Sequence, residues 1–137
     1  MKTIVLISCV SEKLPHKAKA KNLYVSALFT KALTYAYSLH PDTIYILSAN
    51  YGLLDLETEI EPYNSTLNNM RAAEIREWAV RVLEQLSQRT DSHRDRFIFL
   101  AGDKYRKYLM PHLANCEVPL QGLPIGKQLQ FLGTHSK

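Results

Sequence analysis

The chain has 137 residues, of which 46% are apolar and 22% charged, and its formal net charge is +4 with a pI near 9.1. This length fits a single domain over residues 1–137, and the apolar content excludes a chain that stays disordered for want of a core. The mild positive charge permits an anionic ligand or nucleic acid without requiring one.

The patterns that address a protein to a membrane or to an oxidising compartment do not occur in the sequence. A membrane-spanning helix needs about 20 consecutive apolar residues, and no apolar run approaches that length. The chain enters an apolar run directly after Met1-Lys2-Thr3, without the layout of a signal peptide, and contains only two cysteines, Cys9 and Cys116. We therefore expect a cytoplasmic protein with no membrane partner.

Short apolar runs alternate with helix-period segments along the chain. This alternation predicts a three-layer α/β fold whose sheet has about four mostly parallel strands and is covered on both faces. The predicted strands are residues 4–7, 44–47, 97–100 and a weaker one at 117–120.

The helical segments show apolar positions at intervals of three and four residues. Ser26 is placed to cap a helix that runs to Leu39 and ends before Pro41. The clearest amphipathic stripe covers residues 75–86. A shorter helix, interrupted near Pro111, is expected over residues 105–113, and a last one over residues 125–132.

The longest connections follow the first and second predicted strands, at residues 10–25 and 51–68. Parallel strands end at the same edge of a sheet, and ligands bind in the crevice there. We therefore expect the largest pocket at this edge, lined by Cys9, Lys13, Asn50, Tyr51, Tyr63 and Gly102.

Common cofactor and catalytic motifs are missing. There is no GxGxxG or GxxxxGK[ST] sequence for a nucleotide phosphate, and no GxSxG nucleophile turn. The five histidines are not spaced with each other or with cysteines as metal ligands are. We expect neither a cofactor nor a metal.

The first strand ends in Ser8 and Cys9, whose polar atoms could hold an anion or the edge of a base. Cys9 is a candidate nucleophile, although a buried cysteine is more often a small apolar side chain. The loop beyond contains Lys13, and Tyr24 follows it. The other lysines of this loop are Lys17, Lys19 and Lys21. The loop is either a solvated run of charge or a segment that binds phosphate.

The second strand ends in Ser48, and the turn after it contains Asn50, Tyr51 and Gly52. An asparagine amide can both donate to and accept from a base, and a tyrosine ring can stack on one. The same residues would also serve as a simple turn that stops the strand.

An acidic loop follows this turn, with Asp55, Glu57, Glu59 and Glu61. Such a loop is usually a solvated surface, but one carboxylate could act as a general base or stabilise a cation. Glu61 is the favoured candidate because Pro62 stiffens the backbone beside it. The polar residues Tyr63 and Asn64 come next.

The third and fourth strands end in glycine-containing clusters. Gly102 would let a ligand approach the backbone, Tyr105 could close over it, and Asp103 is either a catalytic carboxylate or a helix cap. Gly122 and Gln128 flank the start of the last helix, which gives a modest signal for an anion or base.

Several motifs together resemble a family of small bacterial and phage proteins of unknown function. The motifs are Ser8-Cys9 with Lys13, Leu23-Tyr24-x-Ser26, Ser48-Ala49-x-Tyr51-Gly52-Leu53, Pro62-Tyr63-x-x-Thr66-Leu67, Ala101-Gly102-x-x-Tyr105, and Pro119-Leu120-x-Gly122 with Gly126-x-Gln128-Leu129.

The Ser-Cys, Lys and Tyr-x-Ser part of this pattern is also similar to a domain of the archaeosine synthases, which modify a 7-deazaguanine base in tRNA. That resemblance implies a fold like that of uracil-DNA glycosylases, or more generally a Rossmann-like one. The catalytic Gly-x-Asp-Pro and His-Pro-Ser segments of the glycosylases do not occur in this sequence.

Two functions follow as expectations. In the first, the protein is an N-glycosylase-like or base-modifying enzyme that acts on a modified nucleobase, a nucleoside or single-stranded nucleic acid, with Glu61, Asp103 or Cys9 as the catalytic group. In the second, the same pocket binds a nucleotide or nucleic acid without turnover.

Overall fold

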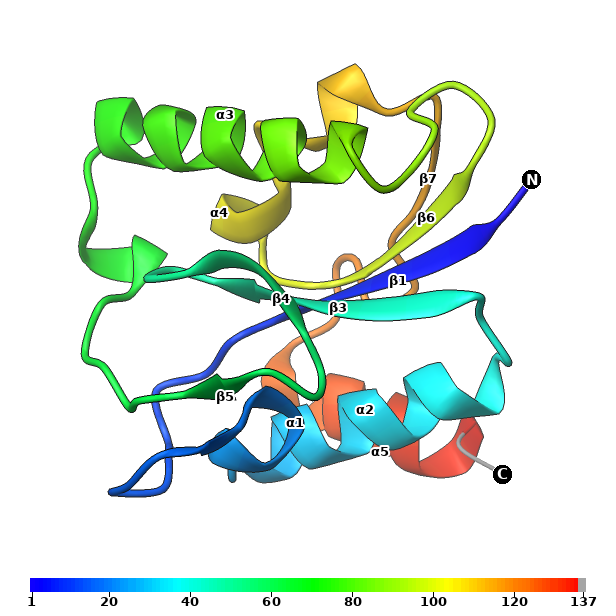
Figure 1. Cartoon of the computed structure of the whole chain (residues 1–137). Helices are drawn as coiled ribbons and strands as arrows, with labels where there is room; N and C mark the ends of the chain where they lie inside the picture. The colour runs from blue at the N-terminus through cyan, green and yellow to red at the C-terminus, as the bar shows by residue number, and fades with distance from the viewer. Residues whose placement is uncertain (136–137) are drawn as a thin grey trace.

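A computed structural model of the chain describes residues 1–135, and its centre is a five-stranded sheet with strand order β4-β3-β1-β6-β7 (Figure 1). β1, β3, β6 and β7 run parallel, and β4 pairs antiparallel with β3. The strands of this sheet are β1 (Thr3–Ser8), β3 (Thr43–Ser48), β4 (Gly52–Asp55), β6 (Arg96–Leu100) and β7 (Asn115–Glu117).

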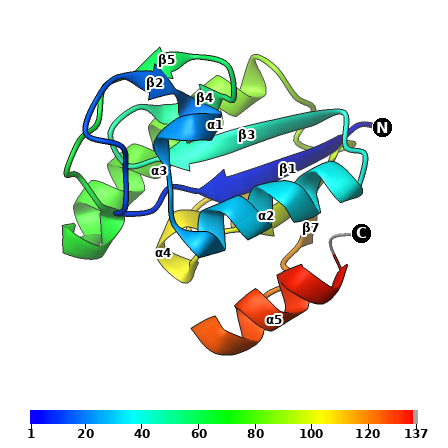
Figure 2. The same ribbon diagram turned by 90° about the horizontal axis from the view of Figure 1, so that it is seen from below.

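The sheet lies between two groups of helices (Figure 1). α3 and α4 lie on one side; α1, α2 and α5 lie on the other, where α2 and α5 pack side by side (Figure 2). Their bounds are α1 (Ala20–Leu23), α2 (Ala27–Ser38), α3 (Ala72–Ser87), α4 (Asp103–Arg106) and α5 (Ile125–His135), with short 3-10 helices η1 (Leu67–Asn69) and η2 (Met110–His112).

Apolar runs and helix-capping residues explain where the central strand and helix form. Residues 4–7 of β1 are at most 1% exposed, as expected for an apolar strand covered on both faces. Ser26 caps α2, and its hydroxyl oxygen accepts a hydrogen bond from the Phe29 N–H at 3.1 Å. The mixed α/β fold and the mostly parallel sheet are therefore confirmed.

Three details differ from the prediction. Residues 51–68 are not one open loop: the chain reverses at Gly52, and β4 adds a fifth strand because Leu53 and Leu54 are apolar enough to pack into the core. The last strand ends at Glu117, because residues 118–123 form turns closed by backbone hydrogen bonds. The predicted short helix over residues 105–113 is divided into α4 and η2.

A second, two-stranded sheet organises the two long loops. β2 (Ala18–Lys19) pairs antiparallel with β5 (Glu59–Ile60), and both lie beside α1 (Figure 2). The loop after β1 thus returns on itself, and an isolated bridge joins Lys13 to Tyr24. Among the described residues, no helix is long and apolar enough to cross a membrane.

Candidate functional site

A cavity of about 800 Å³ opens beside the carboxyl ends of β1 and β6. Its wall comes from the segments after β1, β6 and β7, from the first turns of α2 and α5, and from the segment around η1. The lining residues include Ser8, Cys9, Lys13, Leu28, Phe29, Ala32, Tyr63, Asn64, Asn68, Gly102, Asp103, Lys104, Tyr105, Arg106, Gly122 and Gln128.

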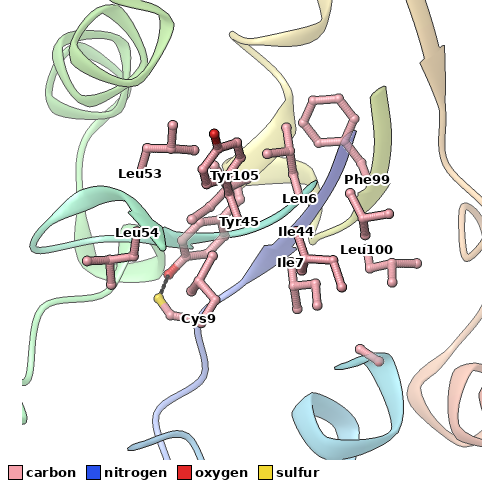
Figure 3. Close-up of a cluster of buried hydrophobic side chains, with 14 of the residues drawn as sticks. Leu6, Ile7, Cys9, Ile44, Tyr45, Leu53, Leu54, Phe99, Leu100 and Tyr105 are labelled. Atoms are coloured by element: carbon pink, nitrogen blue, oxygen red, sulfur yellow. Dashed lines mark hydrogen bonds between the residues drawn. The ribbon is translucent and has the colours of Figure 1, made fainter. Parts of the chain in front are cut away.

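Cys9 and Tyr105 form a buried polar contact in the cavity wall. Cys9 is 8% exposed, and its Sγ lies 3.4 Å from the Tyr105 hydroxyl, a contact marked by the dashed line in Figure 3. The same hydroxyl accepts a hydrogen bond from the Leu67 N–H at 3.4 Å. Burial, with a smaller effect of neighbouring Cys9, raises the pKa of Tyr105 to about 12. Tyr105 is therefore a neutral hydroxyl at physiological pH and can donate a hydrogen bond.

Tyr63 forms another part of the wall, and a chain of hydroxyl groups holds it in place. Ser48, fully buried at the end of β3, donates to the Tyr63 hydroxyl at 2.7 Å, and the Tyr24 and Tyr63 hydroxyl oxygens are 2.6 Å apart. Burial raises the pKa of both tyrosines above the ordinary value. Ser48 and Tyr24 do not line the cavity but hold Tyr63, which does, through these hydrogen bonds.

Lys13 reaches the cavity because the loop around it is fixed. The Leu14 N–H donates to the Leu23 carbonyl at 2.9 Å, beside the bridge between Lys13 and Tyr24. The Lys13 Nζ then lies 4.4 Å from the centre of the Tyr63 ring, a cation–π contact. Burial lowers the pKa of Lys13. The ammonium occupies one face of Tyr63, so a base could stack on that face only if Lys13 moved.

Charge is unevenly distributed around the cavity. Of the described lining residues, Lys13, Lys104 and Arg106 are cations and Asp103 is the one carboxylate. The Lys104 Nζ donates to the Asn68 carbonyl at 3.3 Å, and one Arg106 nitrogen donates to the Ala101 carbonyl at 2.9 Å. The cavity is therefore electrostatically suited to a ligand with an anionic part.

The cavity brings together residues from the first, third and fourth predicted strand-end clusters, whereas no residue of the second cluster lines it. Asn50 and Tyr51 do not line it, contrary to the prediction, because the turn into β4 carries them to the outer side of Tyr63. The Tyr51 and Tyr63 ring centres are 5.6 Å apart, edge to face. Asn50 is exposed, and its Oδ1 accepts from the Ser65 hydroxyl at 3.4 Å.

The two favoured carboxylates differ in position. Asp103 lines the cavity at the start of α4. Glu61 is exposed and lies outside the lining, and its backbone carbonyl accepts a hydrogen bond from the Tyr51 hydroxyl at 3.4 Å. Gly52 is also outside; its φ of +75° forms the turn that begins β4.

Ion pairs connect the basic loop to the acidic loop. Lys19 and Lys21 lie 3.3 and 2.6 Å from Glu57 carboxylate oxygens, and Lys17 lies 3.9 Å from Glu59. These lysines sit around β2 and the acids around β5, so the small sheet itself creates the pairing. Of the four lysines in this loop, Lys13 is the one that lines the cavity.

Some cavity residues were not expected from the sequence. Leu28, Phe29 and Ala32 belong to the apolar stripe of α2, which predicts core packing and does not distinguish a core face from a cavity wall. Arg106 and Asn68 carried no motif. Only their nearness in sequence to strand ends could have indicated that they line the cavity.

The described residues contain no group of three or more His, Cys, Asp or Glu side chains that could hold a metal ion, and both cysteines are free.

A family model described as "Family of unknown function (DUF6884)" matches residues 4–134, and the chain belongs to this family. No curated protein and no solved structure matches the chain.

Proposed function

We propose, for this member of a family with no assigned activity, that the cavity binds a nucleobase with its sugar and that the protein cleaves or modifies the bound nucleoside. The observation that carries the proposal is the composition of one cavity: an apolar wall, side-chain amides, three cations and one carboxylate. A nucleoside or nucleotide presents the matching groups, namely a flat apolar base with a polar edge, a sugar and an anionic end.

Base recognition falls to the apolar and amide parts of the cavity. Leu28, which is half-buried, offers an apolar surface, while Asn64 and Gln128 carry both donor and acceptor atoms that can pair with the edge of a base. The Gln128 Nε2 donates to the Leu123 carbonyl at 2.8 Å. This hydrogen bond fixes the orientation of the amide and leaves its Oε1 as an acceptor. Fixed amides discriminate between bases because a wrong edge leaves them unpaired.

Asp103 is the proposed catalytic carboxylate, since it is the carboxylate among the described lining residues. Water attacks C1′ of the sugar while the bond between C1′ and the base nitrogen breaks, and the electron pair of that bond leaves with the base. Asp103 stabilises the positive charge that develops on the sugar and accepts the proton of the attacking water. That proton then passes to the released base, so the products are the free base and the free sugar.

The sequence resemblance supports the same ligand class. Ser8, Cys9 and Lys13 belong to the pattern shared with the archaeosine synthase domain, and all three line the cavity. We propose accordingly that the fold is uracil-DNA-glycosylase-like or Rossmann-like. The active residues differ from those of the glycosylases, whose catalytic segments are missing from the sequence.

A second candidate is a binding protein without turnover. It is favoured by the exposure of Asp103, because a carboxylate open to water is not held in the dry surroundings that strengthen electrostatic catalysis. Nucleotide binding would then be the whole function.

The test is the product profile. The protein is incubated with free nucleosides and with single-stranded DNA and RNA, each with modified or unmodified bases, and products are identified by liquid chromatography and mass spectrometry. Release of a free base, or a base of changed mass, supports the enzyme. Saturable binding without any product supports the second candidate, and no binding to any of these compounds rejects both.

A further inference from the structure

We infer that the ligand is a free nucleotide, a base with one sugar and a phosphate, rather than a base within a nucleic-acid strand. The inference rests on the proposed function for the base, and on the distribution of charge for the phosphate. It concerns which cations are available to an anion and which are already paired.

The first step concerns the loop that would have to follow a nucleic-acid backbone. Proteins that bind single strands use a positively charged groove along several phosphates. Lys17, Lys19 and Lys21 could extend such a groove along the loop after β1, but each lies within 3.9 Å of a Glu57 or Glu59 carboxylate oxygen. A strand would have to break these pairs and approach both carboxylates.

The second step concerns the cavity itself, where cations outnumber carboxylates. Lys104 and Arg106 both lie on or near α4, and no salt bridge with an acid is found for either within residues 1–135. Arg106 uses one nitrogen to contact the Ala101 carbonyl, and a guanidinium has five N–H donors. The remaining Arg106 donors and the Lys104 ammonium are each able to bind a phosphate oxygen through a charge-assisted hydrogen bond.

The third step concerns size. A volume of about 800 Å³ falls within the range of small-molecule sites. Such a volume accommodates one nucleotide, whereas a strand needs an extended surface. The base would lie against the α2 wall and the phosphate beside Lys104 and Arg106, with Lys13 on the Tyr63 side.

The experiment compares affinities by calorimetry for four ligands: a nucleoside, its 5′-monophosphate, inorganic phosphate and a 15-nucleotide single strand of the same base. The proteins are the wild type, Lys104→Gln, Lys104→Gln with Arg106→Gln, and the control Lys17→Gln with Lys19→Gln and Lys21→Gln. Circular dichroism melts check folding, and Lys104→Gln alone is the variant least able to disturb it, since Lys104 is exposed.

We expect the monophosphate to bind at least about tenfold more tightly than the nucleoside, as charge-assisted hydrogen bonds imply. Lys104→Gln should reduce that ratio, and the double variant should bring it close to one. The triple lysine control should change neither affinity. Binding of the strand should be no tighter than that of the monophosphate.

The inference is overturned if the nucleoside and the monophosphate bind equally. It is also overturned if the strand binds more tightly than the monophosphate, with an affinity that falls with salt as steeply as contacts to several phosphates imply, and if the triple lysine variant lowers that slope. Release of base only from a strand would reject the free nucleotide and leave the proposed reaction standing. Tight monophosphate binding without base release would reject the reaction and leave this inference standing.

Discussion

The Ser48 hydroxyl donates a hydrogen bond to the Tyr63 hydroxyl at 2.7 Å and so connects the end of β3 to the cavity wall. Ser48 is fully buried, and its oxygen also accepts from the N–H groups of Asn50 and Tyr51 at 3.2 and 3.0 Å. The Ser48 hydroxyl thus accepts hydrogen bonds from the turn into β4 and positions the Tyr63 ring in the cavity wall.

Ser48→Ala should lower the free energy of unfolding by about 1–3 kcal/mol, because it removes a buried hydroxyl that donates to Tyr63 and accepts from two partly buried N–H groups. Urea unfolding followed by circular dichroism measures this change. Ser87→Ala is the matched control: Ser87 is exposed, its hydroxyl donates to the Glu84 carbonyl, and the expected change is within about 0.5 kcal/mol. Equal losses in the two variants would contradict the role given to Ser48.

Gly52→Ala should destabilise the protein by about 1–2 kcal/mol or more, since Gly52 has φ +75° and left-handed backbone is costly for other residues. An added Cβ would also lie 2.5 Å from the Gln85 Oε1, the atom that accepts the Leu53 N–H. Gly126→Ala is the opposite case, because Gly126 is in α5 with open space around it, and it should stabilise by up to about 1 kcal/mol. Thermal melts of both variants test the contrast in sign.

Stability should fall at alkaline pH. The pKa of Tyr105 is raised to about 12, whereas an unfolded tyrosine titrates near pH 10. A raised pKa means that the folded state holds the proton more tightly, so this contribution is complete below pH 10 and is lost as the pH rises from 10 to 12. Melting temperatures between pH 8 and 12 should therefore decline less steeply in Tyr105→Phe than in the wild type. Parallel curves would show that Tyr105 does not contribute.

Local rules were sufficient for most of the fold. The Ser26 cap and the apolar positions of β1 depend on neighbours in the chain, and those elements appear where the sequence places them. The sequence does not single out β4: Leu53 and Leu54, after an Asn-Tyr-Gly turn, carry a hairpin signal, but the acids that follow suggest a solvated loop.

The cavity was only partly predictable. The carboxyl ends of parallel strands must meet, which is why Cys9 and Gly102 share a wall. The pairing of Lys21 with Glu57 and the contact of Lys13 with Tyr63 join residues 36 and 50 positions apart, and no local pattern specifies them. Asp103 lines the cavity and Glu61 does not, a difference that sequence position alone does not reveal.

The most direct test of the proposed reaction compares these two carboxylates in single substitutions. The measurement is the initial rate of base release, by mass spectrometry, from the best substrate of the product profile. Asp103→Asn should lower the rate by about a hundredfold or more, since it removes the group that stabilises developing charge, while Glu61→Gln should leave it within about threefold. A full rate in Asp103→Asn, or a loss confined to Glu61→Gln, would contradict the assignment of the cavity as the reaction site.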